Sequence, residues 1–351
     1  MNRPIVHQKG SGAVCSGMNI LVLGGTQFSG RAFVEQATQA NHQITLLHRS
    51  PQNPGLPSSV RRLVGDRDPE KGAGLGEIQK LIDAGERFDA VVDMCGYVPR
   101  VMQASCEMLK DACDLYVFTS TISVYDKDSG DETPDEDSKK IDLEDKSVEE
   151  VNGETYGGLK VLCEQVVRSW YPENHCIVRP TVIAGPNDPT DRVTWWTRMM
   201  GELDAMIIPS PPSGLAGFID SRDLAAFFLR CVEHQISGIY NAVGPEVGLG
   251  LHDFITRTHA AMGSKTKLIE LDESKMESLE LKPWVDIPTY APEEGQFMYR
   301  ISSQRAIDKG LTLRPLEETM LAVRQWDVER GLPELKAGIS EDRMRELVGS
   351  L

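Results

Sequence analysis

The 351-residue sequence has no apolar run long enough to cross a membrane, and its first residues do not have the pattern of a signal peptide. Its seven cysteines include no C-x-x-C pair, which argues against a zinc site and against a disulfide framework. We therefore expect a reduced, cytoplasmic protein that holds no metal and spans no membrane.

Basic residues are too few to balance the acidic ones. The chain has 37 Lys and Arg against 53 Asp and Glu, which gives a formal net charge of −16. Nucleic-acid binding depends on clustered Lys and Arg that contact phosphates, so we do not expect nucleic acid as a partner. The length suits one large α/β domain or a nucleotide-binding domain with a smaller lobe.

Short apolar runs alternate with helix-like stretches from residue 18 to about residue 182. The strand-like runs lie at 19–24, 43–49, 61–65, 88–94, 115–120 and 175–183. Continuous apolar strands separated by helices predict a parallel sheet that is covered on both faces. The sequence therefore predicts an α/β fold, a Rossmann-like doubly wound parallel sheet with a smaller C-terminal substrate lobe.

The chain divides into four predicted parts. These are a flexible N-terminal extension (1–17), a nucleotide-binding domain (18–185), a substrate-binding lobe with some return to the first domain (186–335) and a C-terminal tail (336–351). The acidic segment 126–151 almost lacks large apolar side chains, which predicts a solvated surface loop. A mobile lid is the alternative for that segment.

The stretch GGTQFSG (24–30) follows the first apolar run and precedes a helix-like segment. Glycine lets the backbone approach a pyrophosphate, and the following helix offers unpaired N–H groups at its N-terminus. Gly24 and Gly30 fit a G-x-x-G-x-x-G spacing in which Gln27 replaces the middle glycine. A plain strand-to-helix turn is the alternative. The cofactor-binding candidates in this loop are Gly24, Thr26, Gln27, Phe28, Ser29 and Gly30.

A second group of residues suggests proton transfer. Tyr156 and Lys160 are four residues apart and would share one face of a helix. A nearby ammonium favours the phenolate, so Tyr156 could exchange a proton at neutral pH. Thr121 could hydrogen-bond a substrate alcohol or carbonyl. With the glycine loop earlier in the chain, these residues predict a hydride-transfer site with NAD(P), in which Lys160 also holds the nicotinamide ribose.

These motifs resemble the extended and atypical short-chain dehydrogenase/reductase superfamily, in its NAD-dependent epimerase/dehydratase branch. The resemblance rests on GGTQFSG (24–30), FTSTISVY (118–125), YGGLK (156–160) and RPTVIAGP (179–186). It implies that Thr121 is the catalytic hydroxyl residue. VDMCGYVP (92–99), GPNDPTDR (185–192) and GLTLRPLEETM (310–320) are similar to a subgroup related to the chloroplast stem-loop RNA-binding proteins.

Cofactor preference depends on the end of the second strand-like run. It reads His48-Arg49-Ser50 where NAD-specific sites usually carry Asp or Glu, so Arg49 favours NADP. The alternative is that Arg49 is solvent-exposed or pairs with a carboxylate of the protein. The resemblance implies that Asp66 recognises adenine, that Cys95 lies along the cofactor and that Arg179 lies near the nicotinamide carboxamide.

The candidate substrate contacts are Tyr97, Ser123, Asp188, Arg192 and Trp195. A turn or helix cap is the alternative for Asp188, and packing is the alternative for Trp195.

Three functions remain open. The first is an NAD(P)-dependent oxidoreductase that acts on a small alcohol, carbonyl or sugar-like substrate. The second is a nucleotide-sugar epimerase with tightly bound NAD, which would use the same residues. The third is a nonenzymatic RNA-binding or redox-sensing protein. A homodimer could form through the helix-like stretches 102–112 and 159–170, although each could also simply cover its own sheet.

Overall fold

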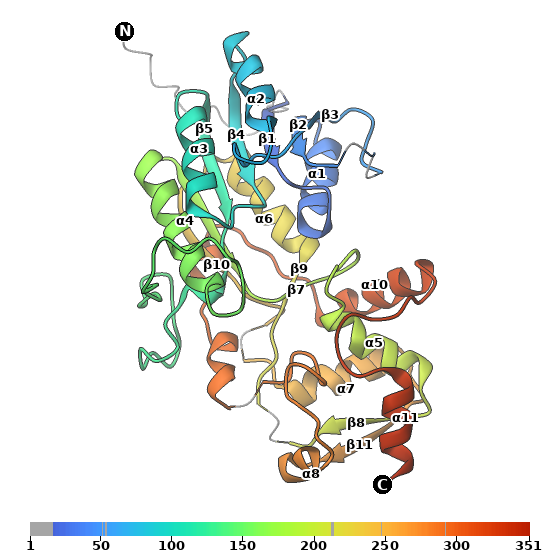
Figure 1. Ribbon diagram of the computed structural model, residues 1–351. Coiled ribbons are helices and arrows are strands. Elements are labelled where there is room, and N and C mark those ends of the chain that lie inside the picture. The colour runs from blue at the N-terminus through green and yellow to red at the C-terminus, as the bar shows by residue number, and fades with distance from the viewer. Residues whose placement is uncertain (1–16, 51, 53–54, 212–213, 247, 292) are drawn as a thin grey trace.

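The computed structural model describes residues 17–50, 52, 55–211, 214–246, 248–291 and 293–351 (Figure 1). The predicted flexible extension lies outside these residues except for Gly17. Within the described part, no helix is both long enough and apolar enough to span a membrane.

A seven-stranded sheet forms the core of the first part of the chain. Its strands lie in the order β10-β6-β5-β4-β1-β2-β3, and every neighbouring pair is parallel. This order confirms the predicted Rossmann-like α/β fold. The strands are β1 (Asn19–Leu23), β2 (Gln43–His48), β3 (Arg61–Val64), β4 (Phe88–Asp93), β5 (Cys113–Thr119), β6 (His175–Pro180) and β10 (Gly238–Ala242).

Helices cover both faces of the sheet, which explains why its strands are apolar without alternation. In β1, Ile20 and Val22 pack into one buried cluster, while Leu21 and Leu23 pack into another. Residues of α1 and α6 belong to the first cluster, and residues of α2, α3 and α4 belong to the second. These helices are α1 (Phe28–Gln39), α2 (Gly74–Asp83), α3 (Pro99–Leu109), α4 (Tyr156–Trp170) and α6 (Ser221–Glu233).

The smaller lobe lies below the sheet in Figure 1 and has a separate hydrophobic core. Trp195 and Trp196 meet edge to face at its centre, with ring centroids 4.9 Å apart. The lobe contains α5 (Arg192–Glu202), β8 (Ala205–Pro209), α7 (Leu251–Ala261), β11 (Lys267–Leu271), α8 (Glu273–Ser278), α10 (Leu316–Glu329) and α11 (Glu341–Gly349). Short elements complete the chain: η1 (Ile122–Val124), β7 (Ile183–Ala184), β9 (Ile219–Asp220), η2 (Glu293–Tyr299) and α9 (Gln304–Asp308).

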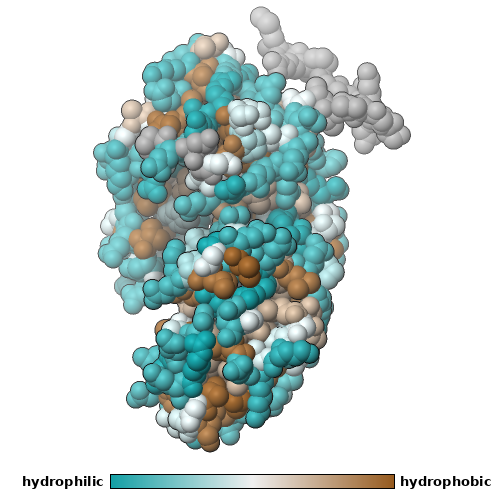
Figure 2. Space-filling model, turned by 90° about the vertical axis from the view of Figure 1, so that its right-hand side faces the viewer, coloured by the Kyte–Doolittle hydropathy of each residue, from teal (hydrophilic) through white to brown (hydrophobic). Residues whose placement is uncertain are grey.

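The last sixteen residues, predicted as a tail, contain helix α11, which packs on the lobe. Met344 and Leu347 of this helix are buried in the lobe's core. The face of the molecule in Figure 2 is mostly hydrophilic, and its hydrophobic side chains gather in small separate groups.

Candidate active site

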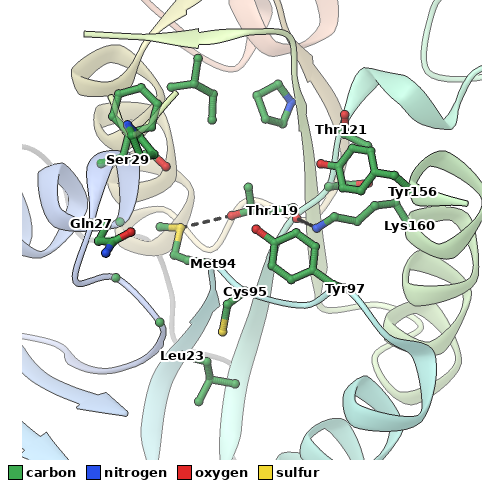
Figure 3. A pocket seen from close by; sticks show the side chains of 18 of the residues that line it. Leu23, Gln27, Ser29, Met94, Cys95, Tyr97, Thr119, Thr121, Tyr156 and Lys160 are labelled. Carbon is green, nitrogen blue, oxygen red and sulfur yellow. Dashed lines mark hydrogen bonds between the residues drawn. The ribbon is translucent and has the colours of Figure 1, made fainter. Parts of the chain in front are cut away.

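A pocket of about 900 Å³ opens at the carboxyl ends of the sheet strands. It is lined by the glycine loop on one side and by the residues of the predicted proton-transfer group on the other. Figure 3 shows Gln27 and Ser29 across the cavity from Thr121, Tyr156 and Lys160. The predicted site residues that line it are Gly24, Thr26, Gln27, Phe28, Ser29, Gly30, Arg49, Asp66, Cys95, Tyr97, Thr121, Ser123, Tyr156, Lys160 and Arg192.

The glycine loop has little room for side chains. Gly24 has a φ of +87° and Gly25 a φ of +88°, values that side-chain-bearing residues rarely adopt. A Cβ added to Gly30 would lie 2.4 Å from the Cα of Gly25, which is a clash with backbone. The residue before α1, Gln27, makes no side-chain cap to the helix. The loop therefore leaves the first N–H groups of α1 without a side-chain cap beside the pocket.

Residues at the ends of β2 and β3 line the part of the pocket next to the glycine loop. Arg49 is exposed, and no ion pair joins it to any other described residue. Asp66 accepts a hydrogen bond from the backbone N–H of Asp68 at 2.9 Å. His48 is only 6% exposed, and neither of its ring nitrogens has a hydrogen-bond partner within the described structure.

A buried ion pair that we did not predict supports this wall. Arg67 lines the pocket and binds Asp93 with an Nη1–Oδ1 distance of 2.6 Å. Asp93 also accepts hydrogen bonds from the hydroxyl of Tyr116 and from the backbone N–H of Cys95. This network fixes the backbone at the end of β4. The sequence signals were weak: a polar residue ending an apolar run, and an arginine after Asp66.

Cys95 lies beside the glycine loop, where a Cβ added to Gly24 would meet its Sγ at 3.1 Å. Burial raises the pKa of the Cys95 thiol, and Arg67 only partly opposes that shift. The thiol is therefore protonated at neutral pH, which does not favour a nucleophilic or redox-sensing role.

The proton-transfer group lies at the ends of β5 and α4. Thr121 caps η1, because its Oγ1 accepts a hydrogen bond from the N–H of Ser123 at 3.1 Å. Lys160, four residues after Tyr156 in α4, donates from Nζ to the carbonyl oxygens of Gly96 (2.8 Å) and Thr119 (2.7 Å). Figure 3 shows Thr121 next to the ring of Tyr156, with Lys160 one helical turn along.

Burial shifts the pKa values of both Tyr156 and Lys160. Burial raises the pKa of Tyr156, while a hydrogen bond with Thr121 and the charge of Arg192 oppose the rise. The ammonium of Lys160 donates to the two backbone carbonyls and not to the hydroxyl of Tyr156. Burial also lowers the pKa of Lys160 to about 8. The lowering of the tyrosine pKa by Lys160 stays a prediction.

Arg179 does not reach the pocket. Its guanidinium is 1% exposed and pairs with Glu164, with Nη2–Oε2 and Nε–Oε1 distances of 2.6 and 2.9 Å. It also donates to the hydroxyl of Tyr125 at 2.8 Å. The prediction concerned the segment 179–181, and within it the side chain of Arg179 is held by Glu164 away from the pocket. The next two residues, Pro180 and Thr181, line the pocket instead.

Asp188 and Trp195 are also absent from the pocket wall. Asp188 is 2% exposed, and its Oδ1 accepts hydrogen bonds from the N–H and the hydroxyl of Thr190, as in a polar turn. Trp195 is fully buried and donates from Nε1 to the carbonyl of Ile339 at 2.8 Å. Both side chains have structural roles, which were the alternatives considered for them.

Arg192 begins α5 and does line the pocket. Its guanidinium lies 5.7 Å from the ring of Trp284, and no carboxylate of the described chain pairs with it. Trp284 and Met298 line the same end of the pocket and come from a segment in which we predicted no site residue. Trp284 and Met298 lie far along the sequence from all the motifs, so no sequence signal could have identified them.

Comparisons with known proteins agree with this arrangement. A model of the NAD dependent epimerase/dehydratase family matches residues 20–242. No curated protein matches the chain.

Several solved structures share the fold. The UDP-N-acetylglucosamine 4-epimerase from Bacillus cereus is 18% identical with a TM-score of 0.64, over 90% of this chain and 100% of that one. The Bordetella bronchiseptica enzyme WbmH, in complex with NAD+, is 14% identical with a TM-score of 0.63 over the same shares. The UDP-Glc/GlcNAc 4-epimerase from Campylobacter jejuni is 15% identical with a TM-score of 0.63, over 89% of this chain and 100% of that one.

The resemblance to the epimerase/dehydratase branch is thus confirmed, while the likeness to the chloroplast stem-loop-binding subgroup stays a prediction. The family model covers more than half of the 351 residues, from the first strand of the sheet to the last. This chain belongs to the NAD dependent epimerase/dehydratase family.

Proposed function

We propose that this protein is an NAD(P)-dependent oxidoreductase of the short-chain dehydrogenase/reductase type that acts on a small alcohol, carbonyl or sugar-like substrate. The observation that carries the proposal is that the glycine loop and the group of Thr121, Tyr156 and Lys160 form opposite walls of one pocket. A nucleotide on the glycine loop would extend along this pocket towards Tyr156.

The residues present fit such a cofactor. The loop at Gly24 and Gly25 has the backbone form that only glycine adopts easily, and it leaves space for a pyrophosphate beside the N-terminus of α1. The hydroxyl of Thr181 and the ring of His48 are buried in the pocket wall without hydrogen-bond partners in the described structure. When bound, the nicotinamide would supply the hydride acceptor or donor.

The chain's own residues would handle the proton and orient the substrate. Because the pKa of Tyr156 is raised, its phenol is protonated at neutral pH and is ready to donate to a carbonyl oxygen. Thr121 would hold that oxygen through its hydroxyl. Lys160 already donates to two carbonyl oxygens, and its third N–H would donate to a ribose hydroxyl.

Arg192 supports a substrate with a negatively charged group. It is a cation on the pocket wall near Tyr156 that makes no ion pair with a carboxylate of the described chain, although the charge of Asp188 lies close enough to interact with it. Carboxylates and phosphates are the groups that a guanidinium binds best. Tyr97 and Ser123 line the same region and would complete the contacts.

A second candidate is a nucleotide-sugar epimerase with tightly bound NAD. The similar solved structures include two UDP-sugar 4-epimerases and an enzyme in complex with NAD+, and an anion-binding Arg192 suits a sugar nucleotide as well. Against it, Arg49 at the end of β2 favours NADP over NAD through its positive charge near the ribose 2′ position.

One experiment distinguishes the two candidates. Ligands released from freshly purified protein are identified by mass spectrometry, and the emptied protein is titrated with NADH and NADPH. An empty protein that prefers NADPH supports the exchanging reductase. Retained NAD(H), especially with a nucleotide sugar, supports the epimerase and contradicts the role of Arg49. Failure to bind either nucleotide would overturn both candidates.

A further inference from the structure

At the end of the pocket beside Arg192, the described residues of the wall carry one positive charge and no negative one. The other arginines and lysines of the wall follow β2 or β3, except for one lysine that donates to two backbone carbonyls: they are Arg49, Arg67, Lys71 and Lys160. The acidic residues of the wall, Asp66 and Asp68, also follow β3. The carboxyl of Asp188 lies near Arg192 but outside the wall, and burial raises its pKa. Since a guanidinium binds a carboxylate through two parallel hydrogen bonds, this end of the pocket suits a ligand with one carboxylate.

The wall around this charge is largely apolar. Trp284 and Met298 line it, and so does Ile122, whose hydrophobic cluster Met298 packs against. Thr190 is polar, but its hydroxyl already donates to Asp188 at 2.7 Å. Hydroxyl groups of a sugar buried against this wall would lose their hydrogen bonds to water without gaining others, whereas an apolar group gains from burial there.

The ring of Trp284 reaches the pocket from a strained turn. Trp284 has a φ of +66°, a left-handed value that a bulky residue rarely adopts. The turn is held by Asp286, whose carboxylate accepts from the N–H of Lys282 at 2.7 Å and whose N–H donates to the carbonyl of Lys282 at 2.9 Å. Backbone strain of this kind clusters at active sites and at residues that clamp ligands. The strain therefore indicates that the ring is placed there for a ligand.

The pocket must hold the dinucleotide as well as the substrate. Its volume of about 900 Å³ lies near the top of the range for pockets that hold one drug-sized ligand, roughly 300–1,000 Å³. With a dinucleotide bound, the space that remains would fit a small molecule and not a second nucleotide.

We propose that the substrate is an aromatic oxo acid, whose single carboxylate binds Arg192 and whose ring packs against Trp284. This rests on the proposed function, because the reacting carbonyl must lie at Tyr156 beside a bound dinucleotide. The guanidinium of Arg192 lies 5.7 Å from the ring of Trp284, so one ligand can meet both side chains. A nucleotide sugar fits poorly, because its diphosphate would have one cation for two charges and its hydroxyls would face apolar side chains.

The reaction at this site is a reduction of the carbonyl group. The carbonyl carbon would accept a hydride from the reduced nicotinamide, and the carbonyl oxygen would take the proton of the Tyr156 hydroxyl as the C=O double bond becomes a single bond. The products are a hydroxy acid, the oxidised cofactor and a tyrosinate that solvent reprotonates. The carboxylate keeps its charge throughout, so it stays on Arg192.

The test uses the full chain with NADPH or NADH, whichever binds more tightly, and follows oxidation of the nucleotide. The probes are phenylglyoxylate and para-acetylbenzoate, two aromatic oxo acids that differ in the spacing of carbonyl and carboxylate. Their methyl esters lack the charge, and pyruvate lacks the ring. For at least one of the acids we expect kcat/KM to exceed that of its methyl ester about tenfold or more, because the ester loses a charged hydrogen bond. Calorimetry of protein saturated with the oxidised nucleotide should show tighter binding of that acid than of UDP-glucose.

Trp284→Leu tests the ring. Leucine keeps the wall apolar but removes the planar face, so the preference for the aromatic acid over pyruvate should fall about three- to tenfold, with little change for pyruvate itself. Trp326→Leu is the matched control. The guanidinium of Arg330 lies 4.1 Å from the ring of Trp326, a similar pairing, but Trp326 is not part of the pocket wall, so the preference should stay unchanged.

Three results would each overturn the proposal while the nucleotide still binds. They are the absence of turnover with both acids, equal kcat/KM for each acid and its ester, and tighter binding of UDP-glucose than of either acid. These comparisons use the wild type, so they stand even if Trp284→Leu does not fold. An equal loss of preference in Trp284→Leu and Trp326→Leu would remove the role of the ring. If neither nucleotide binds the wild type, the proposed function itself fails, which is a different outcome.

Discussion

Burial and the neighbouring polar groups shift the pKa of Tyr156 in opposite directions. Burial raises its pKa, while Thr121 and the charge of Arg192 favour the ionised form. The side chain thus has a proton to give and neighbours that stabilise the anion left behind. This combination is what general acid catalysis needs in a largely enclosed pocket.

Replacing Tyr156 by phenylalanine should remove the proton donor and little else. We expect Tyr156→Phe to lower kcat by about 10²- to 10⁴-fold, the usual contribution of general acid–base catalysis, with unchanged NADPH affinity. Initial rates with any carbonyl compound that the wild type reduces would measure this. Tyr240→Phe, a buried tyrosine of β10 that is not part of the pocket wall, is the control and should keep its turnover. Equal rates for Tyr156→Phe and the wild type would exclude the proposed acid.

The charge of Arg192, which makes no ion pair within the described residues, leads to a prediction about substrate binding. Arg192→Met removes a charged hydrogen-bond donor, so kcat/KM for an anionic substrate should fall about tenfold to a hundredfold. The corresponding value for an uncharged analogue should change much less. Arg300→Met, at an exposed position that does not line the pocket, is the matched control. A similar loss for charged and uncharged substrates would mean that Arg192 acts on folding or on Tyr156 and not on an anion.

The ion pair of Arg179 and Glu164 makes a stability prediction. Both side chains are nearly inaccessible, so the amide in Glu164→Gln would leave the guanidinium charge buried without a counterion. Breaking a buried pair in this way costs about 3–5 kcal/mol. Urea denaturation would measure the loss. Gln165→Glu, the reverse exchange at the exposed next residue, should stay within about 0.5 kcal/mol. A small loss of stability in Glu164→Gln would mean that water or a movement of the chain solvates the unpaired guanidinium of Arg179.

In the glycine loop before α1, the backbone angles at each position explain where glycine is needed better than the usual sequence motif does. Gln27 has φ −133° and ψ 152°, extended angles that any residue can adopt, so no glycine is needed where the usual motif has its middle one. Positive φ angles occur instead at Gly24, Gly25 and Phe28, and the one at Phe28 is +48°. The close approach of the helix to the loop is left to Gly30.

Gly30→Ala tests that close approach. Its methyl group would meet the backbone of Gly25 at 2.4 Å, so α1 must move away from the loop and take its N–H groups with it. We expect at least a tenfold loss of NAD(P)H affinity, or about 1.4 kcal/mol, by fluorescence titration. Gly76→Ala in α2, where an added Cβ touches nothing within 4 Å, should bind normally and be slightly more stable. Unchanged affinity in a folded Gly30→Ala variant would exclude this loop as the pyrophosphate site.

The elements that the sequence predicted well are those with continuous apolar strands. All six strand-like runs became strands of the sheet, within a few residues at their ends. The seventh strand, β10, was missed because its five residues include Asn241, a polar residue that is fully buried. Asn241 is satisfied by the hydroxyl of Tyr125 and by Ser302, contacts far apart in sequence. No local pattern encodes such partners.

The acidic segment 126–151 also makes a contact that its local sequence pattern does not reveal. Its composition predicted a solvated loop, and most of it is exposed. Glu136 is nevertheless 3% exposed and accepts a hydrogen bond from the N–H of Asn241 at 2.8 Å. The loop is therefore fastened to β10 at its middle, an anchor that charge counting alone would not find.

Within the candidate site, the sequence predicted the glycine loop and Tyr156 because their backbone spacing carries the chemistry. Arg179 and Trp195 were also candidates, but their side chains do not line the pocket, since the side to which a residue of β6 or α5 faces depends on partners such as Glu164 and Ile339. It also missed Trp284, whose place on the pocket wall follows from packing of the lobe.

At the scale of the whole molecule, two hydrophobic cores meet around the pocket. One core surrounds the sheet, and the other centres on α5 and α7 of the lobe. The pocket wall includes Tyr156 at the start of α4 and Trp284, which packs against the core of the lobe. The predicted homodimer through α3 and α4 stays a prediction, which light scattering of the purified protein would test.

The charge of the whole molecule argues against the nonenzymatic alternative of RNA binding. The net charge is −16, and many arginines are already held by carboxylates, among them Arg198 by Asp327 and Arg314 by Asp223. Phosphate contacts need free, clustered cations, and their contribution grows as salt is lowered. We expect no saturable binding of a single-stranded RNA at about 150 mM salt, and none at about 20 mM, where electrostatic attraction is strongest.

Fluorescence anisotropy of a labelled RNA measures this, and NADPH binding by the same preparation shows that the protein is active. Saturable binding that weakens steeply with salt would reveal a local basic surface that overrides the net charge. Binding that NADPH displaces would go further, because it would place the RNA in the pocket that we assign to the dinucleotide. If the preparation binds NADPH but not RNA, the enzymatic function is the one that the net charge and the pocket of the protein both support.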